Sequence, residues 1–196
     1  MSNRYDGNFV EAGRLYALDW RLLKAIARQE SNFDPNAINP ADPSYGLMQV
    51  SLSTARALGY TGHPEGLLAP AVGIEWGTKA LADIARRHRT VDAQLAVYNG
   101  GELGGVPRAW LADAAPVYRE RVRGYVERVL SFYRGYQAAH PLTPTSTPAP
   151  VPRPGPVPRP GEPAVTAGGA PGVGRALVVV LILGVVAFFI WRALAR

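Results

Sequence analysis

The 196-residue sequence predicts a mainly α-helical domain followed by two segments of different composition. Apolar residues recur every three or four positions over several stretches of the first 140 residues, which is the period of a helix. Eleven prolines crowd residues 141–172, and sixteen uncharged residues run without interruption from 176 to 191. We therefore divide the chain into a globular domain (1–140), a Pro-rich extended linker (141–174) and a C-terminal transmembrane anchor (175–196).

Six helices are expected from the apolar periodicity and from the residues that bound it. Asp19 is a typical N-cap, and Pro35 forbids continuation of the helix that follows Asp19. Ser51 or Ser53 can cap a short helix further on. Prolines and asparagines crowd residues 32–46, which predicts a loop-rich lobe with at most a short, weak β element. The helices are expected over about residues 6–17, 20–32, 52–59, 71–88, 91–99 and 116–137.

The longest of these helices, residues 116–137, carries an aromatic stripe at intervals of three and four. Such a stripe is more often core than binding site, so we expect it to pack against the rest of the domain. The Gly-rich residues 100–107 before it are expected to form a loop that leads to Trp110. The stripe consists of Tyr118, Val122, Tyr125, Val129, Phe132 and Tyr136.

The charge distribution argues against a nucleic-acid-binding domain. Residues 1–140 contain 16 basic and 14 acidic side chains, whereas the remaining residues contain 5 and 1, so most of the net charge of +6 lies in the tail. A nucleic-acid-binding domain should concentrate positive charge on one of its faces. The basic cluster 86–89 is interpreted as the solvated C-terminal turn of a helix, with contact to an anionic polymer as the lesser alternative.

No metal site or cofactor is expected. Cysteine is absent, and His63, His88 and His140 do not have the spacing of metal ligands. The N-terminal residues Met1–Asp6 are not followed by an apolar stretch, so no cleavable secretory signal is expected.

Glu30 is the residue in the domain that most strongly suggests chemistry. On a helical wheel Leu22, Ile26, Glu30 and Leu23 fall at roughly 0°, 40°, 80° and 100°, so the carboxyl points into an apolar stripe. A carboxylate in such a position is costly unless it is neutral, paired or used. Burial would raise its pKa and allow it to donate a proton near neutral pH. A helix-terminal Glu that turns to solvent is the alternative.

Three segments occur together in this chain: Glu30-Ser31, residues 45–50 (YGLMQV) and residues 96–100 (AVYNG). In this order and spacing they resemble the soluble lytic transglycosylase family of the lysozyme-like superfamily, over about residues 8–137. The resemblance implies a two-lobed, α-rich lysozyme-like fold of the α+β type with a groove between the lobes. It also implies a substrate, the β-1,4 bond between N-acetylmuramic acid and N-acetylglucosamine in peptidoglycan.

The resemblance further implies one catalytic residue and seven substrate-binding ones. By position, Glu30 matches the single catalytic acid/base of the family, and Tyr98 could donate a hydrogen bond that orients it. Leu47 and Met48 could instead be simple core residues. Gly73 stands where the family often has Asn, which makes that part of the groove uncertain. The implied substrate-binding residues are Ser31, Gly46, Leu47, Met48, Gln49, Tyr98 and Asn99.

Glycosidases usually employ two carboxylates, whereas the motif offers one. The resemblance implies that Glu30 protonates the leaving oxygen and that the 6-hydroxyl of the muramic acid then closes on C1, yielding a 1,6-anhydro sugar. Asp34 and Asp42 each precede a proline and are interpreted as turn residues. If either faces Glu30 across the groove, the chain could instead hydrolyse the glycosidic bond with water, as a lysozyme-like muramidase does. A non-catalytic glycan-binding envelope or virion protein is the third hypothesis.

The tail is expected to tether the domain to a lipid bilayer through residues 176–195. Sixteen helical residues span about 24 Å, and the length approaches a full span if Arg192 extends to the interface. The linker could reach on the order of 100 Å. Docking of the tail on a protein partner and either membrane orientation stay open.

A tail anchor would leave the domain on the cytosolic side of a membrane, away from peptidoglycan. We therefore expect a phage protein of the virion or its internal membrane, resembling the virion-associated transglycosylases of membrane-containing phages, with virion or envelope proteins as possible partners. A bacterial inner-membrane enzyme facing the periplasm and a phage lysis enzyme are the alternatives.

Overall fold

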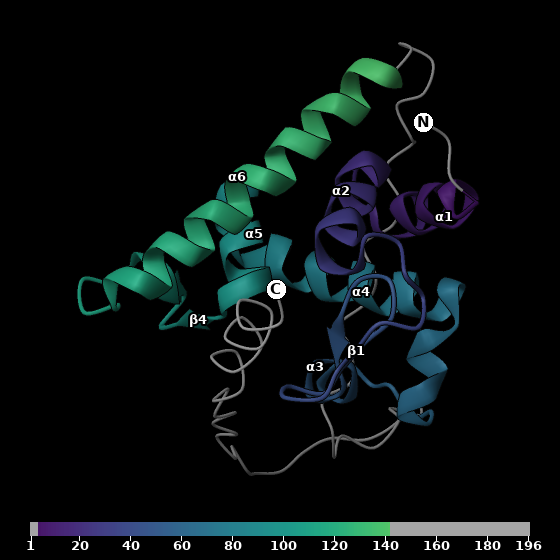
Figure 1. Ribbon diagram of the computed structural model, residues 1–196, viewed down its shortest axis with the longest axis horizontal. Helices are drawn as coiled ribbons and strands as arrows, with labels where there is room; N and C mark the ends of the chain where they lie inside the picture. The colour runs from purple at the N-terminus through teal and green to yellow at the C-terminus, as the bar shows by residue number, and fades with distance from the viewer. Residues whose placement is uncertain (1–3, 142–196) are drawn as a thin grey trace, which may run out of the picture.

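The computed structural model describes residues 4–141, and within them the chain is mainly helical, as predicted (Figure 1). The described part contains six α-helices, two short 3-10 helices and five two-residue strands. The predicted linker and membrane anchor lie outside the described residues. Within residues 4–141, none of the helices combines the length and the apolar character that crossing a membrane requires.

Helix α2 (Trp20–Ser31) is the buried centre of the domain. Residues 21–27 are all buried, and the helix packs against α1 (Asp6–Tyr16) and α6 (Pro116–Ala139). The predicted bounds of α2 are confirmed, because the Asp19 side chain accepts a hydrogen bond from the Arg21 N–H and Asn32 ends the helix in the left-handed region. The apolar stripe that contains Leu22, Leu23 and Ile26 thus becomes core.

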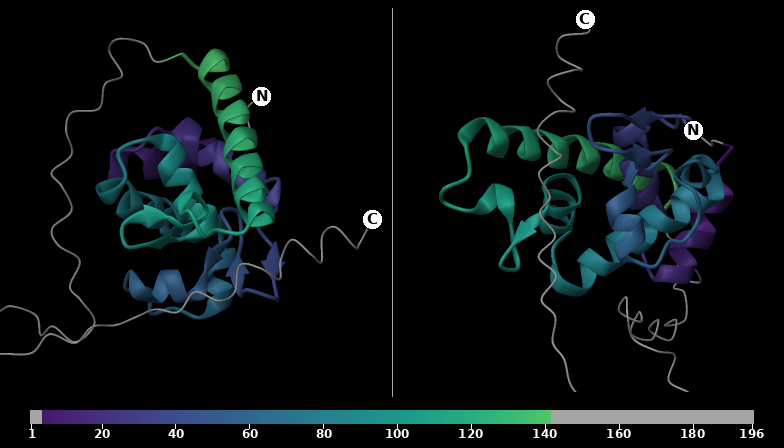
Figure 2. Two further views of the ribbon diagram at one scale, coloured as in Figure 1. Left: turned by 90° about the vertical axis from the view of Figure 1, so that its left-hand side faces the viewer. Right: turned by 90° about the horizontal axis from the view of Figure 1, so that it is seen from below.

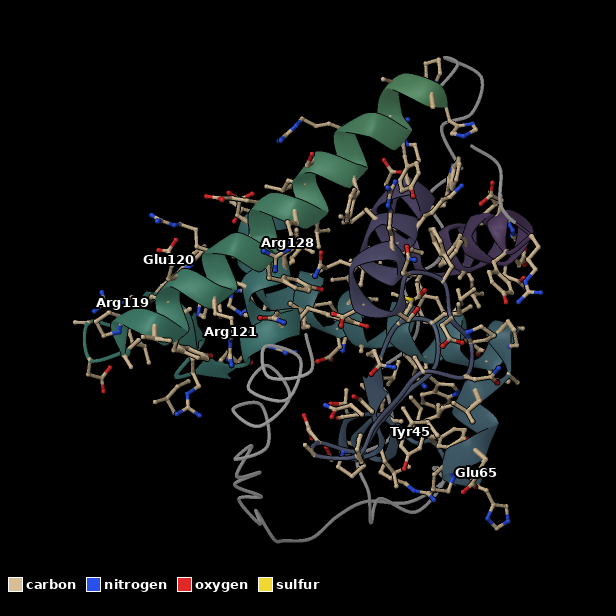
Figure 3. All side chains as sticks on the ribbon, in the orientation of Figure 1. Tyr45, Glu65, Arg119, Glu120, Arg121 and Arg128 are labelled. Carbon is tan, nitrogen blue, oxygen red and sulfur yellow. The ribbon has the colours of Figure 1, made fainter. Side chains whose placement is uncertain are left out.

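Helix α6 lies diagonally along one side of the domain and covers α2 and α5 (Val91–Gly100) (Figures 1 and 2). The prediction that its stripe is core is confirmed for four residues, since Val122, Tyr125, Val129 and Tyr136 are buried. Tyr118 and Phe132 are partly buried. Exposed residues of both charges, including Arg119 and Glu120, occupy the opposite side of the helix (Figure 3). The amphipathic pattern explains why a helix this long stays on one surface of the domain.

The loop-rich lobe contains a three-stranded antiparallel sheet, so the weak β element predicted there is confirmed. Its order is β1 (Ile38–Asn39), β2 (Ser44–Tyr45) and β3 (Val50–Ser51). Of the two serines expected as a cap, Ser51 caps α3 (Leu52–Ala57) by accepting the Thr54 N–H. A 3-10 turn (Pro64–Leu68) then leads into α4 (Pro70–Arg87).

The small lobe is joined to α4 through a close backbone contact. A Cβ atom on Gly46 would lie 2.4 Å from the carbonyl oxygen of Leu67, and one on Gly73 would lie 2.5 Å from the same oxygen. Gly46 also has a φ of +70°, which other residues rarely adopt. Gly73, the position that departs from the family pattern, therefore serves this contact.

Residues 86–107 differ from expectation at the Gly-rich loop and at His88. The loop expected at 100–107 contains a hairpin of β4 (Glu102–Leu103) and β5 (Val106–Pro107), whose turn residues Gly104 and Gly105 both have positive φ, as tight hairpin turns require. The cluster 86–89 lies at the C-terminal turn of a helix, as predicted, and its three arginines are exposed. His88 is buried, with its Nε2 2.5 Å from a carboxylate oxygen of Glu102.

A polar network fastens α6 to the start of α2. Arg21, which is 4% exposed, pairs with Asp19 at 2.6 Å, and the Tyr133 hydroxyl donates to Asp19 at 2.7 Å. Burial raises the pKa of Asp19, but hydrogen bonds from Arg21 and Tyr133 outweigh it and leave the pKa lowered. The stabilisation from Asp19 is therefore present at neutral pH and is lost as the pH falls through this lowered pKa.

We expect Asp19→Ala to lower the free energy of unfolding by about 3–5 kcal/mol, because it removes an N-cap and leaves the buried Arg21 guanidinium without its carboxylate. Urea unfolding of the domain would measure this. The control is Glu11→Ala, which breaks an exposed ion pair with Arg14 and should change stability little. Equal losses of unfolding free energy in the two variants would contradict the stabilising role of Asp19.

Candidate active site

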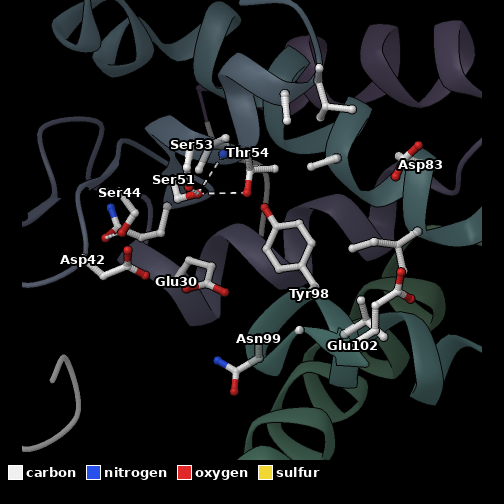
Figure 4. Close-up of a pocket in the computed structure, with 18 of the residues that line it drawn as sticks. Glu30, Asp42, Ser44, Ser51, Ser53, Thr54, Asp83, Tyr98, Asn99 and Glu102 are labelled. Atoms are coloured by element: carbon white, nitrogen blue, oxygen red, sulfur yellow. Dashed lines mark hydrogen bonds between the residues drawn. The ribbon is translucent and has the colours of Figure 1, made fainter. Parts of the chain in front are cut away.

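A cavity of about 370 Å³ lies between the small lobe and the helices. Its walls come from the end of α2, the sheet β1–β3, α3, α4, α5 and the start of β4 (Figure 4). Of the eight site residues expected from the sequence, four line the cavity: Glu30, Gln49, Tyr98 and Asn99. The other four, Ser31, Gly46, Leu47 and Met48, do not.

Glu30 lies in the last turn of α2, on the face that the helical wheel predicts, and is half-buried in the cavity wall. The Tyr125 hydroxyl, from the middle of α6, donates a hydrogen bond of 2.7 Å to Glu30 Oε1. Burial and the negative charge of Glu30 raise the pKa of Tyr125 well above its usual value, so the phenol remains a neutral donor. Tyr125 belongs to the stripe that was predicted to be core, and local sequence signals did not reveal its hydrogen bond to Glu30.

Tyr98 does not make the hydrogen bond to Glu30 that was expected of it. Its hydroxyl donates instead to the backbone oxygen of Met48 at 2.9 Å. Burial raises the pKa of Tyr98 well above its usual value, and the negative charge of Glu30 adds to this effect. Tyr98 thus lies beside the carboxyl while it fixes the segment that contains Met48.

A hydrogen bond and two buried side chains hold the segment 46–49 in place. The Ser31 hydroxyl donates to the backbone oxygen of Leu47 at 2.9 Å. The side chains of Leu47 and Met48 are 1% and 0% exposed, which favours the alternative that they are core. These contacts orient the backbone that leads to Gln49 in the cavity wall.

Gln49 and Asn99 differ in what they can offer a ligand. Gln49 has a φ of +47°, and its Nε2 donates to the backbone oxygens of Ala37 and Gly46 at 3.0 Å each, so its amide N–H groups serve the loop. Asn99 Oδ1 is buried and has no hydrogen-bond partner among residues 4–141. The amide of Asn99, a residue of the cavity wall, is therefore not committed to the loop as that of Gln49 is.

The two aspartates expected in turns differ. Asp34 is exposed and accepts a hydrogen bond from the Asn36 N–H at 2.9 Å, which confirms its turn role. Asp42 also lies in a turn, between β1 and β2, and in addition it lines the cavity with Glu30 (Figure 4). Burial raises the pKa of Asp42. The side chain that caps its turn belongs to Asn39, which accepts the Ala41 N–H at 3.1 Å.

An ion-pair network borders another part of the cavity, on α4 and β4 (Figure 4). Arg87 bonds to Glu102 at 2.9 Å and also pairs with Asp83, and these three residues line the cavity. Among residues 4–141, no group of three or more His, Cys, Asp or Glu side chains is arranged to hold a metal ion.

The chain matches known proteins over this domain. Among curated relatives, it is 32% identical over 155 residues to membrane-bound lytic murein transglycosylase F 1 of Alkalilimnicola ehrlichii, covering 70% of this chain and 31% of the relative. It is 33% identical over 160 residues to membrane-bound lytic murein transglycosylase F of Shewanella loihica, covering 70% of this chain and 32% of the relative. The chain thus spans about a third of the length of these relatives.

Solved structures agree. The 70-kDa soluble lytic transglycosylase of Escherichia coli aligns with a TM-score of 0.59 at 28% identity, covering 72% of this chain and 25% of that one. An inactive glutamate-to-glutamine mutant of lytic transglycosylase Slt from Pseudomonas aeruginosa aligns with a TM-score of 0.59 at 25% identity, covering 69% and 24%. The predicted lysozyme-like fold is thereby confirmed. The family described as the transglycosylase SLT domain matches residues 7–110, more than half of the chain, and the chain belongs to this family.

Proposed function

We propose that this chain is a peptidoglycan lytic transglycosylase that cleaves the β-1,4 bond between N-acetylmuramic acid and N-acetylglucosamine. The observation that carries the proposal is the Glu30 carboxyl, held by Tyr125 in the wall of a cavity within an SLT domain. The names of the relatives, lytic murein transglycosylases, support this substrate and reaction.

The reaction can be written with Glu30 as the only proton carrier. Neutral Glu30 protonates the glycosidic oxygen, the bond from that oxygen to C1 breaks, and the substrate's acetamido group stabilises the positive charge at C1. The Glu30 carboxylate then takes the proton of the muramic acid 6-hydroxyl, whose oxygen bonds to C1. The product is a 1,6-anhydro sugar, no water is consumed, and Glu30 ends in its starting form.

The surrounding residues support this role for Glu30. The Tyr125 hydrogen bond restricts rotation of the carboxyl, which keeps its proton directed at one place in the cavity. Asn99 lines the cavity and its Oδ1 has no hydrogen-bond partner among residues 4–141, so its amide can turn to bind an acetamido group. Ser31 and Tyr98 act by fixing the backbone of residues 47–48.

We expect Glu30→Gln to lower cleavage of purified peptidoglycan at least 10²-fold, because the amide cannot donate and recover the proton. Release of muropeptides, read by mass spectrometry, measures it, and circular dichroism should report an unchanged fold. Glu65→Gln, an exposed glutamate outside the cavity, is the control. Full activity in Glu30→Gln would exclude the proposed role. Peptidoglycan binding without turnover in the wild type would favour a glycan-binding protein instead.

Tyr125→Phe should lower kcat roughly 10- to 100-fold and leave KM nearly unchanged, because it removes one hydrogen bond to the reacting carboxyl and no contact to the sugar. Steady-state kinetics on soluble glycan strands would separate the two constants. The control is Tyr118→Phe, which removes a hydrogen bond to the Gly100 carbonyl on the same helix face. A rise in KM alone would refute a positioning role for Tyr125.

We also propose that residues 176–195 attach the enzyme to a lipid bilayer and that residues 141–174 act as a spacer. The uncharged run in the sequence supports this, as do relatives named membrane-bound. We expect the full chain to sediment with membranes after a high-salt wash and a chain ending at residue 174 to remain in the supernatant. Equal partition of both would contradict the tether.

The place of action proposed here is a phage virion with an internal membrane, cutting the host wall locally; a bacterial inner membrane facing the periplasm is the alternative. In the same fractionation, the chain would be found in purified particles in the first case and in isolated envelopes in the second. Recovery from the cytosol alone would contradict both.

A further inference from the structure

Asp42 stands on a turn whose backbone is fixed on both sides. The turn joins β1 to β2 and is flanked by Pro40 and Pro43, which restrict φ. Asn39, which is 5% exposed, accepts the Ala41 N–H, and the carbonyl of Pro43 accepts the Leu52 N–H at 2.9 Å. The Asp42 side chain is therefore presented to the cavity from a defined position.

Asp42 differs from the other acidic residues of the cavity wall. Asp83 pairs with Arg86 and Arg87, and Glu102 pairs with Arg87 and lies within hydrogen-bond distance of His88. Asp42 makes no hydrogen bond or ion pair with any group in residues 4–141, although it is half-buried. Figure 4 shows the side chains of Asp42 and Glu30, which come from different elements of the fold, in the wall of the same cavity.

The half-buried position of Asp42 is unfavourable for the stability of the fold and favourable for proton transfer. A half-buried carboxylate without a cation or donor loses hydration and gains no interaction, so it does not stabilise the turn. Burial raises the pKa of Asp42, which makes its carboxylate a stronger base than one in water. Two carboxyl groups in the wall of one cavity, one of them with a raised pKa, are typical of sites that move protons.

We propose that Asp42 is a second catalytic carboxyl group, which activates a water molecule and gives the enzyme a hydrolytic branch beside the 1,6-anhydro product. This inference rests on the proposed function. Once Glu30 has protonated the glycosidic oxygen and the bond to C1 has broken, the Asp42 carboxylate takes a proton from water while the water oxygen bonds to C1. The product is a reducing N-acetylmuramic acid, one water is consumed, and the proton on Asp42 returns to Glu30 through solvent.

The test is digestion of purified peptidoglycan by the full chain in H₂¹⁸O, with mass spectrometry of the muropeptides. Reducing ends formed by the enzyme carry ¹⁸O, whereas pre-existing ends do not, and 1,6-anhydro ends form without water. We expect the wild type to give both products. Asp42→Asn should lower the ratio of labelled reducing ends to anhydro ends at least tenfold, and Asp42→Glu should restore part of it. The ratio is independent of how much of a variant folds.

Asp34→Asn is the matched control, because the same change falls on an exposed aspartate of the same lobe and keeps the oxygen that accepts the Asn36 N–H. It should leave the ratio at the wild-type value, and Glu30→Gln should abolish both products. An unchanged ratio in Asp42→Asn, or a wild type that gives anhydro ends alone, overturns the role of Asp42. A wild type that gives only labelled reducing ends, lost in Asp42→Asn, upholds Asp42 and overturns the transglycosylase proposal.

Discussion

The packing of α6 across α2 holds the domain and its cavity together, because both ends of α2 depend on tyrosines of α6. At the start of α2, Tyr133 donates to Asp19, which caps the helix and pairs with Arg21. At its end, Tyr125 donates to Glu30. The two hydroxyls are eight residues apart on α6, about two helical turns, so one helix face both stabilises α2 and orients the carboxyl. The interface between α2 and α6 thus stabilises the domain and also orients the Glu30 carboxyl.

The motif segments divide into residues that line the cavity and residues that support its wall. Ser31 and Tyr98 both donate to consecutive carbonyls of the segment that contains Leu47 and Met48. The buried side chains of this segment and the two hydrogen bonds to its carbonyls leave its backbone little freedom. A family motif therefore identifies a rigid arrangement as a whole, and a match to it does not mean that each matched side chain touches the sugar.

Local signals in the sequence were enough for the bounds of α2 and for the face that carries Glu30, since capping and helical period depend on near neighbours. The hydrogen bond from Tyr125 to Glu30 was not predicted, because the two residues are 95 positions apart in the sequence. The available signal was that a buried tyrosine needs an acceptor for its hydroxyl. Asp42 lies in the turn that Asp-Pro predicts, but local signals could not show that this turn borders the cavity or that Asn39 supplies its capping oxygen. The hairpin at 102–107 was signalled by Gly104-Gly105, but strands of two residues leave almost no periodicity.

The carbonyl of Leu67, enclosed by Gly46 and Gly73, has a consequence for how the small lobe can move. At this point the backbones of the groove segment, the 3-10 turn and α4 are in direct contact, with no layer of side chains between them. Side chains can exchange rotamers to absorb a shift, whereas backbones in contact cannot. A shift of the small lobe along α4 would therefore force backbone atoms into overlap at this junction, so we expect the lobe to keep its position relative to α4.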